Sequence, residues 1–349
     1  MLFTGSTTPK VAINGFGRIG RAFFKLGLAK SEFDIVAIND LGDAQTLAYL
    51  LQYDSVYGRW NTAVSVRESG GQKFLVVGDK EIIFLQEKEP TNLPWGKLSI
   101  DIVIEATGIF ESFEKASVHK QAGAKRVVLT APAKDEDNPE AKTVLMGVNE
   151  EDLKTCSISS NGSCTTNSVS PVLQILSEKL GVKKAFLNTT HGYTATQNLV
   201  DGPVKGSDMR RGRAGAVNIV PSFTGAAVAV TRAVKQLANK FDGVSMRVPV
   251  ATGSLSAITF VSAKPTTPEE INNILKKAEK EPRWQGILRT TTDQLVSTDI
   301  VGDPYAAIVD LSLTKVVDGD LCCVYSWYDN EFGYTNTLVG HVIKVAQTF

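Results

Sequence analysis

The sequence has little cysteine and no excess of charge of either sign. Only four cysteines occur among 349 residues, and two of them, Cys322 and Cys323, are neighbours. They form neither a disulfide framework nor a CxxC pair, which indicates a reducing compartment and predicts a cytoplasmic protein. The 37 basic residues are balanced by 37 acidic ones, so composition gives no reason to expect a nucleic-acid partner.

Long apolar runs are also missing. No stretch approaches the ~18 uninterrupted apolar residues of a membrane span, and residues 1–10 lack the apolar core of an export signal. We therefore expect neither a membrane protein nor a secreted one. The chain is 43% apolar and long enough for about two domains, which predicts a globular protein stable without disulfides.

The first half alternates short β-branched runs with helical patterns. Strands are expected at 11–14, 33–39, 100–105 and 126–130, hairpin strands between 64 and 85, and helices at 18–30, 43–53 and 111–122. This alternation predicts an α/β domain with a doubly wound parallel sheet of the Rossmann type.

Beyond residue 160 the pattern changes. Long strands such as 257–263 and 321–327 are flanked by helical patterns at 166–180 and 268–280, which predicts an α+β domain with a mostly antiparallel sheet. Residues 200–222 are rich in Gly and Arg without a clear period, so we expect a long ordered loop. A last helical pattern covers 330–346, and periodicity alone assigns it to neither domain.

A glycine fingerprint follows the first expected strand. Gly15, Gly17 and Gly20 form G-x-G-x-x-G at the start of a helical pattern, where a dinucleotide pyrophosphate can approach helix-terminal N–H groups. Asp40 ends the second expected strand about 20 residues later, where the fingerprint places the acid that binds ribose hydroxyls. The spacing predicts a dinucleotide site, and the acid favours NAD over NADP.

Cys164 is the one cysteine in an unusual context. It follows an expected strand, opens a helical pattern and has small polar neighbours, whereas Cys156, Cys322 and Cys323 lie in apolar strand patterns typical of core residues. A helix N-terminus or a histidinium lowers the pKa of a thiol. We therefore predict that Cys164 is a nucleophile.

Only three histidines are present. His119 and His341 fall in expected helices and are interpreted as ordinary packed or surface residues. His191 ends an expected strand, and in a chain with Cys164 it is the candidate base of a Cys–His pair.

Several cations are candidate anion contacts. Arg210, Arg211 and Arg213 lie in the long loop, and such a basic cluster is commonly a solvated face. Arg247 differs because it stands in an apolar strand pattern, where it needs a partner or a ligand such as a phosphate.

Together these motifs closely resemble phosphorylating glyceraldehyde-3-phosphate dehydrogenases over nearly the whole chain. The resemblance rests on residues 14–21, 160–167, 191–194, 221–227, 246–249 and 327–334. It implies NAD-dependent oxidation of glyceraldehyde 3-phosphate to 1,3-bisphosphoglycerate through a cysteine hemithioacetal and a thioester. It also implies a homotetramer whose small-molecule substrates are the aldehyde phosphate and inorganic phosphate.

The resemblance also implies a role for individual residues, with no metal. Cys164 and His191 are the expected catalytic pair. The expected substrate and phosphate contacts are Ser163, Thr165, Thr194, Arg211, Thr224, Gly225 and Arg247. The expected cofactor contacts are Gly15, Gly17, Arg18, Ile19, Gly20, Asp40, Lys88, Thr107, Gly108, Thr130, Asn330 and Tyr334. Residues 1–163 would be the NAD-binding domain, with helix 330–349 packed back on it, and 164–329 the catalytic domain.

The chain departs from the family pattern at four positions near these motifs. Gly162 stands where alanine is usual, Ser168 where a second cysteine is common, Gly192 where serine or alanine is common, and Phe223 where a small hydroxyl residue is common. The long loop is also about one residue longer than in relatives.

Three other functions share part of these motifs. Erythrose-4-phosphate dehydrogenase shares the cysteine motif, but Tyr193, Thr194, Tyr328 and Phe332 favour the glyceraldehyde-3-phosphate enzyme. A non-catalytic nucleotide-binding regulator on the same fold would have no need of the Cys–His pair. A Cys–His hydrolase would have no use for the N-terminal glycine fingerprint.

Overall fold

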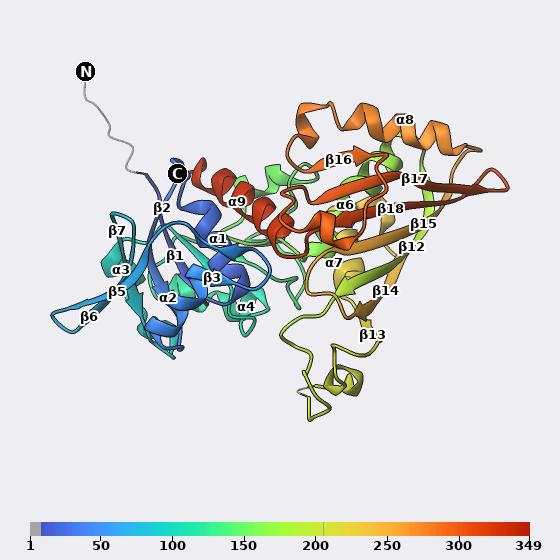
Figure 1. Cartoon of the computed structure of the whole chain (residues 1–349). Helices are drawn as coiled ribbons and strands as arrows, with labels where there is room; N and C mark the ends of the chain where they lie inside the picture. Colours follow the sequence, from blue (N-terminus) through green and yellow to red (C-terminus); the bar gives the residue numbers. More distant parts are fainter. Residues whose placement is uncertain (1–7, 205) are drawn as a thin grey trace, which may run out of the picture. The chain divides into compact units, whose positions relative to one another are not determined.

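The computed structural model describes residues 8–204 and 206–349, which form two compact units (Figure 1). Unit 1 joins the residues up to Val144 with Glu150–Asn161 and Leu338–Phe349, and unit 2 contains Leu145–Asn149 and Gly162–Thr337. The expected lack of an export signal concerns residues that lie mostly outside the described ranges. In those ranges no helix is both long and apolar enough to cross a membrane.

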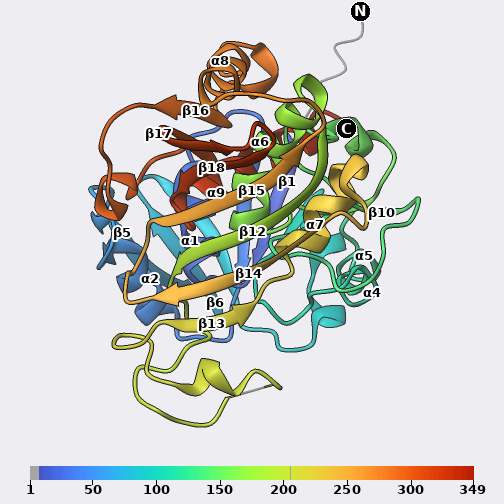
Figure 2. The same ribbon diagram turned by 90° about the vertical axis from the view of Figure 1, so that its right-hand side faces the viewer.

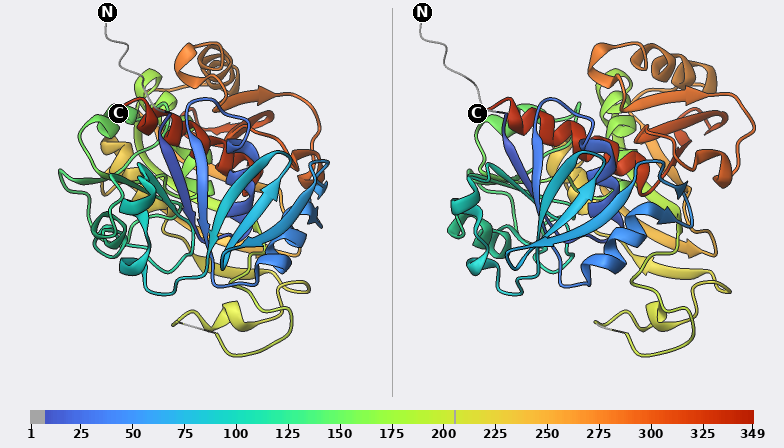
Figure 3. Two further views of the ribbon diagram at one scale, coloured as in Figure 1. Left: turned by 90° about the vertical axis from the view of Figure 1, so that its left-hand side faces the viewer. Right: turned by 60° about the vertical axis from the view of Figure 1, so that its left-hand side comes forward.

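Unit 1 is built on a nine-stranded sheet (Figure 3). Its strands, in spatial order, are β10 (Ala141–Thr143), β11 (Ile158–Ser160), β9 (Arg126–Leu129), β8 (Ile102–Glu105), β1 (Lys10–Asn14), β2 (Asp34–Asn39), β7 (Lys80–Leu85), β6 (Gln72–Val77) and β5 (Val64–Ser69). The six strands from β11 to β7 pair in parallel, and their chain order is that of a doubly wound dinucleotide-binding fold. The predicted Rossmann-type sheet is confirmed.

The parallel strands are apolar because both faces of the sheet are covered. Val11 and Ile13 belong to one buried cluster, and Ala12 between them belongs to another. The helices of this unit are α1 (Arg18–Gly27), α2 (Ala44–Gln52), α3 (Trp95–Leu98), α4 (Phe113–Ala116) and α5 (Val118–Gln121), with 3-10 turns at Pro90–Asn92 and Glu150–Lys154 and a β3–β4 hairpin (Tyr53–Asp54, Gly58–Arg59).

The chain ends in α9 (Phe332–Ala346), whose last part belongs to unit 1. Leu338, Val342 and Val345 are buried in the same cluster as Val11 and Ile13. Figure 3 shows this red helix beside the blue strands of the sheet. The final helical pattern therefore completes the core of the first unit.

Unit 2 carries a seven-stranded sheet (Figure 2). In spatial order its strands are β13 (Val220–Phe223), β14 (Phe241–Val248), β12 (Val182–Gly192), β15 (Ser254–Ser262), β18 (Leu321–Tyr328), β17 (Ala307–Val317) and β16 (Leu288–Thr291). Four of the six neighbouring pairs are antiparallel, as predicted, and β12–β14 and β16–β17 are parallel.

Three helices supply the apolar partners of this sheet. Leu173 and Leu176 of the first helix are buried in one cluster with Ile258, Phe260 and Val324 of the strands. The helices are α6 (Cys164–Lys179), α7 (Ala226–Ala233) and α8 (Pro268–Ala278), with 3-10 turns at Met209–Gly212, Lys235–Leu237, Pro282–Trp284 and Ser297–Ile300.

Two predicted elements differ in the structure. The helix expected at 111–122 is split into α4 and α5, and at the break the Ser117 hydroxyl donates to the carbonyl of Glu114. Such a bond competes with helical pairing. The loop expected at 200–222 includes one 3-10 turn, and its end forms edge strand β13.

Candidate active site

The start of α6 presents Cys164. Ser163 caps the helix: its hydroxyl accepts from the Thr166 N–H, and its own N–H donates to the Thr166 hydroxyl. Gly162 precedes the cap with a φ of 63°, and a Cβ there would lie 3.0 Å from the Thr166 side chain. Glycine in place of the family's alanine therefore suits this turn.

Cys164 and His191 meet in unit 2. The sulfur lies 3.3 Å from Nε2 of His191, which stands near the end of β12. His191 is buried, whereas Cys164 keeps partial exposure. The structure thus brings together the two residues predicted to be catalytic, in the geometry of a nucleophile beside its base.

Arg247 contacts the other side of the imidazole ring. It lies opposite His191 in the parallel β12–β14 register, and one guanidinium nitrogen is 2.6 Å from Nδ1. Nδ1 also lies 2.7 Å from the carbonyl oxygen of Gly192. The carbonyl favours a proton on Nδ1, and the guanidinium, which only donates, disfavours one. The ring's tautomer therefore depends on whether Arg247 has another partner.

Burial favours the neutral forms of both groups in the pair. Desolvation raises the pKa of the Cys164 thiol, although Arg247 opposes this by favouring the thiolate. Desolvation, followed by the charge of Arg247, lowers the pKa of His191 to about 3. This differs from the lowered thiol pKa expected from the sequence, because the cost of burying the charge exceeds the favourable contacts.

Tyr328 braces this pair and was not predicted as a site residue. Its buried hydroxyl lies 2.9 Å from the Thr165 hydroxyl and 2.8 Å from that of Thr189, and its ring meets the His191 ring edge to face at 6.0 Å. It thereby links the residue after Cys164 to the strand of His191. The contact with Thr165 spans 163 positions, so no local pattern could have revealed it.

The other residues predicted to contact phosphate groups lie between β12 and β13 (Thr194 and Arg211) and directly after β13 (Thr224 and Gly225). Arg211 donates to the hydroxyls of Thr196 and Ser222, and its charge also lowers the pKa of His191. The Thr194 hydroxyl lies 3.0 Å from that of Thr196. Both Arg210, at 2.9 Å, and Arg211, at 3.8 Å, form an ion pair with Asp208, and Arg210 also lies over the Phe223 ring. Thr224 and Gly225 stand just before α7, following β13, which pairs with the strand of Arg247.

The glycine fingerprint forms a tight turn at the carboxyl edge of the unit 1 sheet. A Cβ on Gly15 would lie 2.6 Å from the backbone of Ala106, and one on Gly20 would lie 2.1 Å from the carbonyl oxygen of Gly15. A Cβ on Gly17 would meet nothing within 4 Å, and no side chain caps α1 at this residue. The turn therefore leaves space in front of Gly17 at the start of α1, which fits the approach of a dinucleotide pyrophosphate.

Asp40 follows β2 and holds the same loop. Its carboxylate accepts from the Phe16 N–H at 2.6 Å and from the Gly42 N–H at 2.8 Å. Arg18 forms a two-pronged ion pair with Asp54 at 3.2 Å. The two backbone donors fix the position of the Asp40 carboxylate at the end of β2.

The other predicted cofactor residues are divided between the units. Ile19 packs against the apolar core, Lys88 is exposed after β7, and Thr107, Gly108 and Thr130 follow β8 and β9. Asn330 and Tyr334 belong to unit 2. There Ser254 accepts from the Gly192 N–H and donates to Asn330, while the Tyr334 hydroxyl donates to the carbonyl of Gly162.

Comparison with known proteins gives concordant matches. Residues 9–113 match the family model described as glyceraldehyde 3-phosphate dehydrogenase, NAD binding domain, and residues 163–330 match its C-terminal domain. The glyceraldehyde-3-phosphate dehydrogenase of Clostridium pasteurianum is 46% identical over 95% of this chain and 96% of its own length. That of Borreliella burgdorferi is 46% identical over 97% and 100%, and that of Streptomyces coelicolor 45% identical over 97% and 98%.

Proposed function

The chain belongs to the glyceraldehyde-3-phosphate dehydrogenase family, and on that premise we propose that it oxidises glyceraldehyde 3-phosphate with NAD and inorganic phosphate through a covalent bond to Cys164. The observation that carries this proposal is the 3.3 Å contact between the Cys164 sulfur and Nε2 of His191. A thiol beside an imidazole can attack a carbonyl while its proton remains in the site.

The first step joins the sulfur of Cys164 to the aldehyde carbon. His191 receives the thiol proton, and the developing oxyanion accepts hydrogen bonds from the Cys164 N–H and from His191. Bound NAD supplies the acceptor for the hydride that leaves this carbon. His191 returns the proton to the oxyanion, which becomes a hydroxyl, and takes it again as the hydride leaves, so that a thioester remains on Cys164.

Inorganic phosphate ends the cycle by attacking the thioester. The C–S bond breaks, the acyl phosphate leaves, and Cys164 is regenerated. Ser163, Thr165, Thr194, Arg211, Thr224 and Gly225 are the proposed contacts for the anions. Support comes from Arg211. Two hydroxyl groups hold its guanidinium in place, and its charge lowers the pKa of His191.

Arg247 is the proposed contact for a phosphate group and a regulator of the base. While Arg247 donates to Nδ1 of His191, the proton of the neutral ring lies on Nε2. Nε2 must lose this proton before it can accept the one from the thiol. A phosphate that attracts the guanidinium would leave Nδ1 to donate to the Gly192 carbonyl 2.7 Å away. Binding of a phosphorylated substrate would thereby prepare His191 to act as a base.

Unit 1 is the proposed cofactor domain and unit 2 the catalytic domain. Gly15, Gly17 and Gly20 would hold the pyrophosphate and Asp40 the ribose, with the further contacts Arg18, Ile19, Lys88, Thr107, Gly108, Thr130, Asn330 and Tyr334. The open space in front of Gly17 and the uncapped start of α1 support this assignment.

We further propose a cytoplasmic homotetramer. Large apolar side chains are exposed along the long loop, and contact with another subunit would bury them. They are Leu199, Val200, Met209, Val217, Ile219 and Phe223. Light scattering coupled to gel filtration should give four times the chain mass of 37.6 kDa. A monomeric mass would contradict the proposal.

Absorbance of reduced nicotinamide tests the function. It should rise when glyceraldehyde 3-phosphate, NAD and phosphate are supplied together, and arsenate should replace phosphate. Full turnover without either anion would indicate a hydrolytic enzyme, and faster turnover of erythrose 4-phosphate would indicate the alternative substrate.

A further inference from the structure

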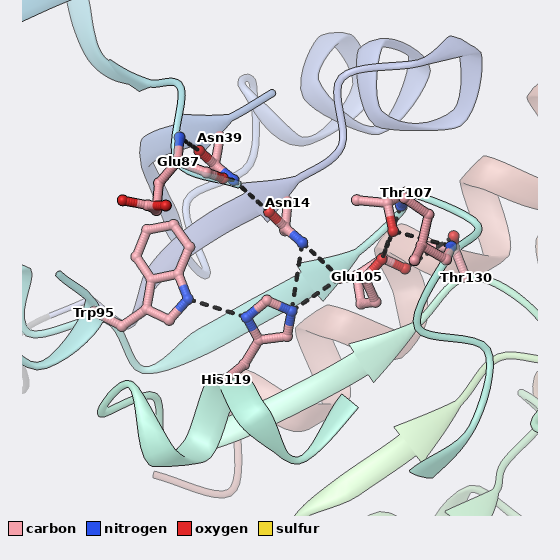
Figure 4. Close-up of polar contacts among 9 residues, drawn as sticks. Asn14, Asn39, Glu87, Trp95, Glu105, Thr107, His119 and Thr130 are labelled. Atoms are coloured by element: carbon pink, nitrogen blue, oxygen red, sulfur yellow. Dashed lines mark hydrogen bonds and ion pairs between the residues drawn. The ribbon is translucent and has the colours of Figure 1, made fainter. Parts of the chain in front are cut away.

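Two series of hydrogen bonds converge on the buried carboxylate of Glu105 (Figure 4). In the first, Asn39 donates to Asn14 at 2.8 Å, and Asn14 donates to Glu105 at 2.7 Å. In the second, the Trp95 indole N–H meets Nδ1 of His119 at 3.2 Å, and Nε2 of His119 lies 2.9 Å from Glu105.

The donors in this network fix the charge of its two titratable members. An indole N–H can only donate, so Nδ1 of His119 accepts. Nε2 lies 2.9 Å from Glu105 and farther, 3.4 Å, from the Asn14 amide nitrogen, so the neutral ring carries its proton on Nε2, facing Glu105. Glu105 also accepts from the N–H and the hydroxyl of Thr107. A carboxyl group that accepts from four donors is ionised, and its one ion-pairing neighbour among the described residues, His119, is uncharged.

Glu105 lies where the sheet reverses its order. Strands β1 and β2 extend to one side and β8 and β9 to the other, and Glu105 is opposite Asn14 at the carboxyl ends of β8 and β1. Dinucleotides bind at such a switch point, with one mononucleotide half on each side. The Glu105 carbonyl also accepts from the N–H and the hydroxyl of Thr130, so both threonines proposed to contact the cofactor depend on this residue.

We propose that Glu105 makes the cofactor site favour oxidised NAD over NADH. The inference rests on the proposed function and adds a determinant of cofactor redox state to it. The oxidised nicotinamide is one charge unit more positive than the reduced ring, and a buried carboxylate is poorly screened by salt. The negative charge of Glu105 therefore favours the oxidised form. The bonds from Thr107 also hold its hydroxyl in place, with the hydroxyl hydrogen donated to Glu105.

Direct binding measurements test this role without any aldehyde. Affinities for NAD and for NADH are measured by calorimetry on the wild type and on Glu105→Gln, which keeps the shape of the side chain and removes its charge. The affinity for NAD should fall about three- to tenfold relative to that for NADH. An equal change in both affinities, or a shift toward NAD, would overturn the inference.

Thr107→Val is the matched control. It removes a hydroxyl that donates to Glu105 but keeps the charge, so it should lower the affinities for both dinucleotides by the same factor.

The wild type gives a test that does not depend on the folding of any variant, because it should bind NAD more tightly than NADH. Equal or tighter binding of NADH would overturn the inference alone, and binding of neither dinucleotide would overturn the proposed function with it.

Discussion

The sulfur of Cys164 lies 3.3 Å from Nε2 of His191, although the residues are 27 positions apart and stand on a helix and a strand. The contact depends on the start of α6, which places the cysteine, and on β12, which places the imidazole. Arg247 reaches the same ring from the adjoining strand. The site is therefore formed by contacts between side chains of different elements, and a single substitution can remove each contact separately.

Alkylation at neutral pH is expected to modify Cys164 before the other cysteines. Cys156 and Cys322 are buried, and Cys323 is partly exposed like Cys164 but lies next to no histidine in the described residues. With inorganic phosphate in the buffer to attract Arg247 away from Nδ1, the imidazole can take up the proton at Nε2 as the sulfur attacks, which favours reaction at Cys164. Peptide mass spectrometry during treatment with iodoacetamide measures the four rates.

His191→Asn is the control for that reactivity. It should slow labelling of Cys164 and move its pH dependence to higher pH, because the proton acceptor is lost while burial still raises the pKa of the thiol. Labelling of Cys323 should not change. Equal rates at Cys164 and Cys323 in the wild type would contradict the assignment of the nucleophile.

Replacement of Tyr328 by phenylalanine should lower kcat by about tenfold with a smaller change in the KM for NAD. The loss of its hydroxyl leaves Thr165 and Thr189 without a shared partner and costs about 1 to 3 kcal/mol of stability. Tyr325→Phe, on the same strand, is the control and should retain activity. Unchanged kcat in Tyr328→Phe would show that this brace does not position the pair.

Acid should destabilise the fold through His341. This histidine is buried on α9 with Nε2 2.7 Å from the Ser159 hydroxyl, and desolvation followed by the charge of Arg126 lowers its pKa to about 3. The unfolded chain, with a histidine pKa of about 6.5, takes up the proton first as pH falls. The stabilisation from this group is therefore complete above pH ~6.5 and is lost between there and pH ~3.

The variant His341→Gln, which retains a polar group near Ser159, isolates this contribution. Between pH 7 and pH 5 the wild type should lose about 2 kcal/mol more of its unfolding free energy than the variant. Urea unfolding at the two pH values measures the difference. The same pH dependence in both proteins would show that His341 accepts a proton in the folded state.

Cofactor choice should depend on Asp40. Its carboxylate is fixed by two backbone donors at the end of β2, and a 2′-phosphate ~4 Å away would be disfavoured by about 1 kcal/mol in water and ~4 kcal/mol at surface-like dielectric. Catalytic efficiency with NAD should exceed that with NADP by about tenfold or more.

Asp40→Gly should narrow that gap mainly by improving the catalytic efficiency with NADP, because it removes the carboxylate that repels the 2′-phosphate. Asp43→Asn, which changes a nearby carboxylate that only caps α2, should leave the preference unchanged. Comparable efficiencies of the wild type with NAD and NADP would contradict the role of Asp40.

Local patterns were sufficient to predict the sheets and the main motifs. The glycine fingerprint and the start of α6 are each encoded within a few residues, and the structure confirms the expected parallel and mostly antiparallel sheets. Long-range polar contacts were not predictable. His119 was interpreted as an ordinary helical residue, because its partners Trp95 and Glu105 come from other elements and share no period with it.

A trapped acyl enzyme tests the central claim most directly. The chain is mixed with glyceraldehyde 3-phosphate and NAD without phosphate or arsenate, quenched with acid after one turnover, and digested for peptide mass spectrometry. The peptide containing Cys164 should carry the acyl group in an amount equal to the NADH formed, and Cys164→Ser should form neither. One equivalent of NADH with an unmodified Cys164 peptide, or an acyl group on another residue, would contradict covalent catalysis by Cys164.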